Sequence, residues 1–210
     1  MDKTLLTLVR HGETEWNLQG RLQGHLDSPL TGRGRAQAAA LAEALAGRAF
    51  DAIYSSDLGR AMQTAEILAG PEAEVVTIPD LRERHLGCFQ GHTWDELDQT
   101  MPETVRAFRQ ADADWPIPAG ESAQQRFERN IRAFEKIARD NPGRQVLVIG
   151  HGGSMDSMMR HVLGLDLITP RPFTIRNAAR NVFIRTGGRW MLDVWGDACH
   201  LAQTGSLDDI

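Results

Sequence analysis

Short runs of apolar residues alternate with helix-forming stretches along most of the chain. Four runs are typical of buried strands: 5–9, 50–54, 75–78 and 145–149. Helices are predicted between them, from Thr31, a suitable N-cap, to about 46, and again over about 57–69. Strands that alternate with helices indicate a three-layer α/β/α fold, in which a mostly parallel sheet lies between two layers of helices.

The C-terminal part of the chain adds a helix and a closing pair of strands. The helix is predicted directly after His151-Gly152-Gly153, where the run 145–149 ends. The two strands, 181–185 and 190–194, flank the turn at Gly187-Gly188. The edge strand of this pair is a candidate contact for a homodimer.

The central segment has a different residue pattern. Residues 92–142 are polar and helix-forming and contain no run that is typical of a strand. Ser122 is a candidate N-cap for a helix in which Phe127, Ile131 and Phe134 recur at helical spacing. We therefore predict one domain over 1–210, in which roughly 85–142 forms a mainly helical cap over the active site. Ligands of open α/β sheets bind beyond the carboxyl ends of the strands, where such a cap would cover them.

Composition narrows the class of protein further. A chain of 210 residues with 41% hydrophobic residues can bury a sizeable core, and its formal charge of −5 argues against nucleic-acid and membrane partners. There is no signal-peptide pattern and no apolar run near the ~20 residues of a membrane span. Cys88 and Cys199 have neither a CxxC partner nor a metal-ligand spacing, which favours packing roles and a cytoplasmic location.

Two strand ends carry the candidate chemistry. Arg10-His11-Gly12 follows the run 5–9, and His151-Gly152 follows the run 145–149. Arginine offers a planar cationic fork for phosphate oxygens, neutral histidine is a competent nucleophile, and Gly12 would let an oxyanion approach the backbone. Either pair alone is also typical of an ordinary loop. Both pairs together, each directly after an apolar strand, favour a phosphate site.

The segment Val9 to Asn17 resembles the signature of the histidine phosphatase superfamily, which includes the cofactor-dependent phosphoglycerate mutases. Similar segments follow in the family's order: 23–31, 54–61, 81–83, 120–122 and 151–152. The resemblance implies a phosphoglycerate mutase-like fold and a small phosphorylated metabolite as substrate. It also implies phosphoryl transfer through a phosphohistidine. We expect no metal or other cofactor, because no Asp/His cluster has a metal-ligand spacing.

The resemblance further implies roles for individual residues. His11 would be phosphorylated on Nε2, and Glu83 would protonate the departing oxygen and then activate water. Three residues would surround the phosphoryl oxygens with charge or hydrogen-bond donors: Arg10, Arg60 and His151. Uncharged contacts to the phosphate are expected from Asn17, Gln23, Gly24 and Gly152. Such cationic donors can do the electrostatic work of a metal in phosphoryl transfer.

Several of these residues also have ordinary interpretations. Arg60, which follows Asp57, is compatible with a surface ion pair, and Glu83 stands in an alternating charge pattern that is typical of a solvated face. Asn17 is also a common turn residue. Glu121-Ser122 is interpreted as a helix start. The remaining histidines are assigned to packing or surface roles: His25, His85 and His92.

Hydrolysis is favoured over the mutase reaction by departures from the mutase pattern. Family mutases hold a substrate carboxylate with a Tyr, a Lys and an Arg pair, whereas Leu86 and Trp94 stand here and no Arg-Arg occurs between 84 and 130. Gly153 occupies a position where mutases usually carry Asn. We expect Leu86, Phe89 and Trp94 to contact a weakly charged leaving group. A phosphoglycerate mutase and a non-catalytic phospho-ligand binding protein remain the alternatives.

Overall fold

The computed structural model describes residues 3–70 and 72–204. Its sheet has six strands in the order β3-β2-β4-β1-β5-β6. The strands are β1 (Thr4–Arg10), β2 (Ala52–Ser55), β3 (Val76–Thr77), β4 (Gln145–Gly150), β5 (Arg180–Thr186) and β6 (Arg189–Asp197). The first four strands of that order run parallel, and β5 and β6 join antiparallel to β1 and to each other. The predicted α/β fold with a mostly parallel sheet is confirmed.

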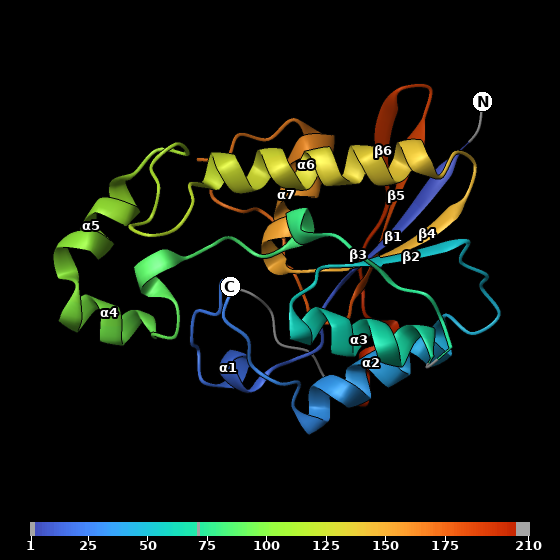
Figure 1. The fold of residues 1–210 in the computed structure, drawn as a ribbon, viewed down its shortest axis with the longest axis horizontal. Coiled ribbons are helices and arrows are strands. Elements are labelled where there is room, and N and C mark those ends of the chain that lie inside the picture. The colour runs from blue at the N-terminus through green and yellow to red at the C-terminus, as the bar shows by residue number, and fades with distance from the viewer. Residues whose placement is uncertain (1–2, 71, 205–210) are drawn as a thin grey trace.

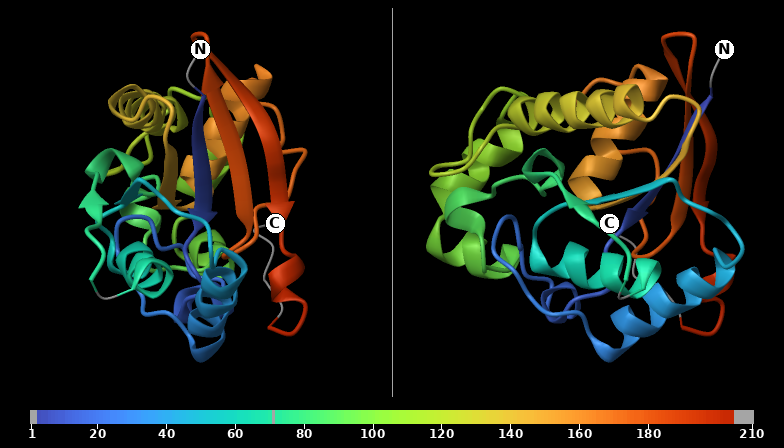
Figure 2. Two further views of the ribbon diagram at one scale, coloured as in Figure 1. Left: turned by 90° about the vertical axis from the view of Figure 1, so that its right-hand side faces the viewer. Right: turned by 45° about the vertical axis from the view of Figure 1, so that its right-hand side comes forward.

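Helices cover both faces of this sheet (Figures 1 and 2). On one face, α2 (Gly32–Ala44) and α3 (Gly59–Ala69) bury Leu41 and Ala61 against Val9 and Ile149. On the other face, α6 (Ala123–Asp140) and α7 (Gly152–Leu163) form a larger core with β1, β4 and β5. The two central strands, β1 and β4, are therefore buried on both sides, which explains their continuous apolar runs.

The pairing of β1 with β4 positions the chemistry. The two strands are parallel, with Arg10 opposite Gly150, and the His11 N–H donates to the Gly150 carbonyl oxygen at 3.0 Å. The residues that follow both strands consequently leave the same edge of the sheet side by side. The two His-Gly pairs therefore converge at one edge of the sheet.

A separate lobe lies beyond this edge (Figure 1). It contains η2 (Gly87–Phe89), α4 (Trp94–Thr100) and α5 (Pro102–Gln110), and it has its own small core of Phe89, Leu97, Val105 and Ile117. The predicted cap of 85–142 is too long at its C-terminal end. The amphipathic helix α6 buries Phe134 and Ile137 in the main core and so belongs to the layer that covers the sheet.

The remaining elements are short. They are α1 (Glu15–Leu18) after β1, η1 (Pro79–Leu81) after β3, and η3 (Cys199–Leu201) after β6. The strand predicted over 75–78 shrinks to the exposed pair Val76–Thr77, because it lies at the edge of the sheet and pairs only through Tyr54 and Ser55. Within the described ranges, no helix is both long and apolar enough to cross a bilayer.

Candidate active site

His11 sits at the end of β1 with its ring almost fully buried. Its Nδ1 lies 2.8 Å from the Gly12 carbonyl oxygen. A carbonyl oxygen can only accept, so Nδ1 carries the proton and Nε2 keeps its lone pair. Burial, followed by the charges of Arg60 and Arg10, holds the pKa of His11 well below its usual value. The ring is therefore neutral at pH 7, as a nucleophile must be.

His151 lies beside His11, with 5.3 Å between the ring centroids. Its Nε2 is 2.8 Å from the Ser56 hydroxyl, while its buried Nδ1 has no hydrogen-bond partner among the described residues. Burial and then the charge of Arg60 lower its pKa well below the usual value, so this ring is also neutral. The cavity wall at this point is formed by Gly152 and Gly153.

Arg10 and Arg60 bring two buried guanidinium groups to the same place. Arg10 donates to the Ile175 carbonyl oxygen at 2.9 Å. Arg60, only 1% exposed, donates to the Gly24 carbonyl oxygen at 2.8 Å and to Asp27 Oδ1 at 3.1 Å. Burial lowers the pKa of Arg60, and the charge of Asp27 partly offsets that effect. These contacts fix both arginines beside His11, where their charge faces an incoming anion.

Arg60 does not form the surface ion pair with Asp57 that its sequence position also allowed. Asp57 instead accepts from Arg82, with its Oδ1 2.7 Å from Arg82 Nε. The guanidinium of Arg82 consequently holds the pKa of the Asp57 carboxyl below its usual value. Arg60 turns inward, toward the cavity.

Helix α1 and the loop after it supply the uncharged part of the site. Asn17, Gln23 and Gly24 all line the cavity. Asn17 also completes the N-terminal capping box of α1 by accepting from the Thr14 N–H at 3.1 Å. Gln23 donates from Nε2 to the Thr14 hydroxyl at 2.8 Å. Asn17 is thus a residue of α1 that caps the helix and lines the cavity, and it does not occupy the turn that its residue type also allowed.

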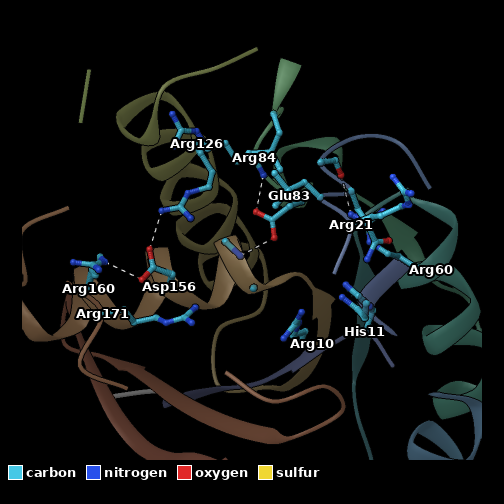
Figure 3. A pocket seen from close by; sticks show the side chains of 17 residues that line it. Arg10, His11, Arg21, Arg60, Glu83, Arg84, Arg126, Asp156, Arg160 and Arg171 are labelled. Carbon is cyan, nitrogen blue, oxygen red and sulfur yellow. Dashed lines mark hydrogen bonds and ion pairs between the residues drawn. The ribbon is translucent and has the colours of Figure 1, made fainter. Parts of the chain in front are cut away.

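Glu83 enters the cavity from the segment after η1. Its Oε1 accepts from the Arg84 N–H at 2.7 Å, and its Oε2 accepts from the Gly153 N–H at 2.9 Å. The backbone of Glu83 is held from behind, because its carbonyl oxygen accepts from Arg129 at 2.7 Å. The carboxylate is therefore a fixed cavity group and not part of a solvated face. Figure 3 shows it among the side chains that line the cavity.

The reason for Gly12 differs from the predicted one. Its N–H donates to the Thr64 hydroxyl at 3.0 Å, and it does not line the cavity. A Cβ at Gly12 would lie 2.5 Å from the Gly34 carbonyl oxygen at the start of α2. Gly12 is therefore required by close backbone packing and does not make room for an oxyanion.

The cavity of about 410 Å³ is more cationic than the sequence suggested (Figure 3). Sequence reasoning missed six charged residues that line it: Arg21, Arg84, Arg126, Asp156, Arg160 and Arg171. The expectation of an apolar contact for the leaving group is wrong in two of its three residues. Phe89 is fully buried in the core of the cap, and Trp94 stacks on Phe108 at 5.4 Å. Leu86 does line the cavity.

Most residues assigned to structural roles make structural contacts, but Cys199 is exposed and does not have the packing role expected for it. Ser122 caps α6 by accepting from the Gln125 N–H at 3.0 Å, and Glu121 pairs with Arg129. The rings of His25 and His85 pack edge to face at 4.6 Å, and His92 lies 3.7 Å from Glu96. Cys88 and Cys199 are free thiols. No group of three or more His, Cys, Asp or Glu side chains in the described part of the chain is placed to hold a metal.

Taken together, a buried neutral histidine whose Nε2 keeps its lone pair, two fixed arginines and a carboxylate in the same cavity define a phosphoryl-transfer site. Comparison with known proteins agrees with this class. The model of the histidine phosphatase superfamily (branch 1) matches residues 6–198. Phosphoglycerate mutase-like protein 4 of Arabidopsis thaliana is 39% identical over 212 residues, 99% of this chain and 91% of that protein.

Two phosphatases are also similar. A metal-independent phosphoserine phosphatase of Arabidopsis thaliana is 39% identical over 208 residues, 97% of this chain and 86% of that protein. The crystal structure of a phosphoserine phosphatase mutant from Entamoeba histolytica, in complex with phosphoserine, has a TM-score of 0.83 and 31% identity. The match between the two structures covers 94% of this chain and 99% of the phosphatase chain. The chain belongs to the histidine phosphatase superfamily and is a phosphomonoester hydrolase that acts on a small phosphorylated substrate.

Proposed function

We propose that the enzyme cleaves its substrate by transferring the phosphoryl group to His11 Nε2 and then to water. The observation that carries this proposal is the hydrogen bond from His11 Nδ1 to the Gly12 carbonyl oxygen. That bond fixes the tautomer and leaves Nε2 as the nucleophilic atom. Attack by Nε2 forms the N–P bond while the bond from phosphorus to the ester oxygen breaks.

Charge on the transferring phosphoryl group is stabilised by Arg10 and Arg60, which line the cavity beside His11. Asn17, Gln23, Gly24 and Gly152 complete the proposed phosphate site. His151 is proposed as a further neutral contact of the phosphoryl group, because its buried ring lies 5.3 Å from the His11 ring and its pKa is lowered by burial. The positive charge comes from arginines, so we propose a metal-independent reaction that needs no other cofactor.

Glu83 is the proposed general acid and base. In its protonated form it gives its proton to the departing oxygen, and the resulting carboxylate then takes a proton from the water that attacks phosphohistidine. A positioned acid or base contributes about 100- to 10,000-fold to a rate. The presence of both His11 and Glu83 in one cavity supports catalysis over passive binding of a phosphorylated ligand.

Hydrolysis is the favoured outcome over isomerisation, and O-phosphoserine, named for two of the similar proteins, is a suitable first substrate. The chain lacks Tyr and Lys at the mutase-like positions 86 and 94, where Leu86 and Trp94 stand. The cytoplasmic location, the homodimer contact through β6 and the lack of nucleic-acid or membrane partners stay predictions from the sequence.

A two-channel assay tests this proposal. The enzyme is incubated with 3-phosphoglycerate and a 2,3-bisphosphoglycerate primer, and in parallel with O-phosphoserine and p-nitrophenyl phosphate. Release of inorganic phosphate and formation of 2-phosphoglycerate are measured together. We expect phosphate release to exceed isomerisation. Isomerisation that is faster than phosphate release from every substrate would assign the mutase reaction instead.

A further inference from the structure

One wall of the cavity is cationic far beyond what a single phosphoryl group requires. Seven arginines but only two carboxylates, Glu83 and Asp156, line the cavity in the described part of the chain. Arg84, Arg126 and Arg171 form what we call the arginine wall. In Figure 3 these three lie on the α7 side of Glu83, whereas His11 and Arg60 lie on its other side.

Arg84 is a half-buried cation whose guanidinium contacts a carbonyl oxygen and an aromatic ring. Its Nε donates to the Glu121 carbonyl oxygen at 3.0 Å, and its guanidinium lies over the Phe108 ring at 5.7 Å. It makes no ion pair with any acidic side chain that the structure describes. Burial, followed by the nearby charge of Arg126, lowers the pKa of Arg84 to about 10. An anion in the cavity would relieve this repulsion between two cations.

Arg126 shares its carboxylate partner with a second arginine. Its Nη2 lies 2.9 Å from Asp156 Oδ2, but Asp156 Oδ1 also accepts from Arg160 Nε at 2.9 Å. One aspartate thus serves two arginines. The Nε of Arg126 is buried and has no hydrogen-bond partner in the described part of the chain. Arg126 therefore lines the cavity with a charge that its shared carboxylate only partly balances.

Arg160 has a different role, because its guanidinium is turned to the backbone. Its Nη1 donates to the Asp166 carbonyl oxygen and its Nη2 to the Thr169 carbonyl oxygen, the latter at 2.9 Å. These bonds anchor the segment that leads to Arg171, whose side chain points into the cavity in Figure 3. Three separate segments thus bring their arginines to one wall.

We propose that the arginine wall binds a second anionic group of the substrate, a carboxylate or a second phosphate carried by the leaving group. This inference rests on the proposed function, in which the first phosphate lies at His11. The wall also lies beside the acid, since Glu83 and Arg126 both approach Gly153 closely. A leaving group held there by its own negative charge would place its ester oxygen near Glu83. The wall is a specificity site for doubly anionic phosphomonoesters.

Matched substrate pairs test the proposal. O-phosphoserine is compared with O-phosphoethanolamine, and 3-phosphoglycerate with glycerol 3-phosphate, because each pair differs in the carboxylate. Propane-1,3-diol bisphosphate and its monophosphate form the pair that differs in a second phosphate. A charge-assisted hydrogen bond is worth about 1.5–3 kcal/mol, so kcat/KM should favour the more anionic member of at least one pair by about 10- to 100-fold. Preference in the carboxylate pairs or in the bisphosphate pair identifies which anion the wall takes.

Variants then locate the preference. Arg84→Gln and Arg126→Gln should each move the ratio within the preferred pair toward 1. Arg126→Lys, which keeps the charge but loses the planar fork, should retain an intermediate ratio and covers the case in which Arg126→Gln does not fold. Arg106→Gln is the matched control, because Arg106 lies on α5 with its side chain 63% exposed and does not line the cavity. It should leave the ratio unchanged.

The same ratios are also measured as Kd values in the His11→Ala variant by titration calorimetry, which does not depend on turnover. The proposal that the arginine wall binds a second anion is overturned if the ratios are near 1 in every substrate pair for the protein with all wall arginines intact. It is also overturned if the preference survives both Arg84→Gln and Arg126→Gln. A binding preference without any phosphate release, even from p-nitrophenyl phosphate, would support the wall and reject the proposed hydrolysis. Hydrolysis with no preference would reject the wall alone.

Discussion

Replacing Gly153 by alanine should displace the carboxylate of the proposed catalytic acid without lowering the stability of the fold. Gly153 is in the first turn of α7, and a Cβ there would lie 2.9 Å from Arg126 Cδ and closer still to Glu83 Oε1. Both neighbours belong to long side chains that can change rotamer, so they can move away. Ordinary contact distances require a shift of the carboxylate by about 1 Å. A misplacement of that size can cost about 100-fold in rate.

The fold itself should tolerate this change. Gly153 is helical and is not among the glycines with positive φ. Alanine is favoured over glycine inside a helix by about 1 kcal/mol. We therefore expect the Tm of Gly153→Ala to stay unchanged or rise slightly, while kcat/KM for an alkyl phosphate such as glycerol 3-phosphate falls about 100-fold. The loss should be smaller for p-nitrophenyl phosphate, whose leaving group needs less help from an acid.

Gly32→Ala is the matched control. Gly32 is the first residue of α2, and a Cβ there meets nothing within 4 Å. Its kcat/KM for both substrates should equal that of the unaltered enzyme. Retention of alkyl phosphatase activity within about twofold in Gly153→Ala would refute the placement of Glu83 as the acid, because the predicted effect of misplacing it is about 100-fold. A loss that tracks a fall in Tm would refute the separation of activity from stability.

Three further predictions follow from the charges in the site. Because the pKa of His11 lies well below its usual value, kcat/KM for p-nitrophenyl phosphate, corrected for substrate ionisation, should stay level as the pH falls from 7.5 to 6.5; an acid limb centred at about 6.5 or higher would contradict this. His11 and His151 both have lowered pKa values in the folded protein, so below about pH 6.5 the unfolded chain binds more protons than the folded one. The urea concentration at the midpoint of unfolding should therefore fall from pH 7.5 to pH 5. A midpoint that does not change with pH would argue against burial of the two rings. Turnover should also survive dialysis against EDTA, because arginines supply the positive charge; loss on dialysis and recovery with a divalent ion would reject the metal-independent mechanism.

The part of the site that depends on strand topology could be predicted from the sequence. The apolar runs before His11 and His151 indicated two buried strands, and parallel neighbours must end at one edge. That geometry brings the two rings to 5.3 Å. Arg60 needed the family resemblance as well, because its position after Asp57 alone suggested a surface ion pair. Its true partners, Gly24 and Asp27, are distant in the chain.

The rest of the cavity depends on tertiary packing that the local pattern does not contain. Arg84 and Arg126 meet only because α6 packs on the sheet and because the segment after η1 passes beside α7. The apolar residues of the cap suggested a weakly charged leaving group, yet Phe89 packs inside the core of the cap. A small lobe that projects from the sheet must bury its aromatic residues in itself, which leaves charged residues to face the substrate.

The site of covalent phosphorylation tests the mechanism most directly. The enzyme is mixed with substrate, quenched in alkali, where phosphohistidine survives, and its peptides are examined by mass spectrometry. The mechanism predicts one added phosphoryl group on the peptide that contains His11, formed within a single turnover and absent from the His11→Ala variant. A phosphoryl group on any other residue, or one that persists in His11→Ala, would contradict it.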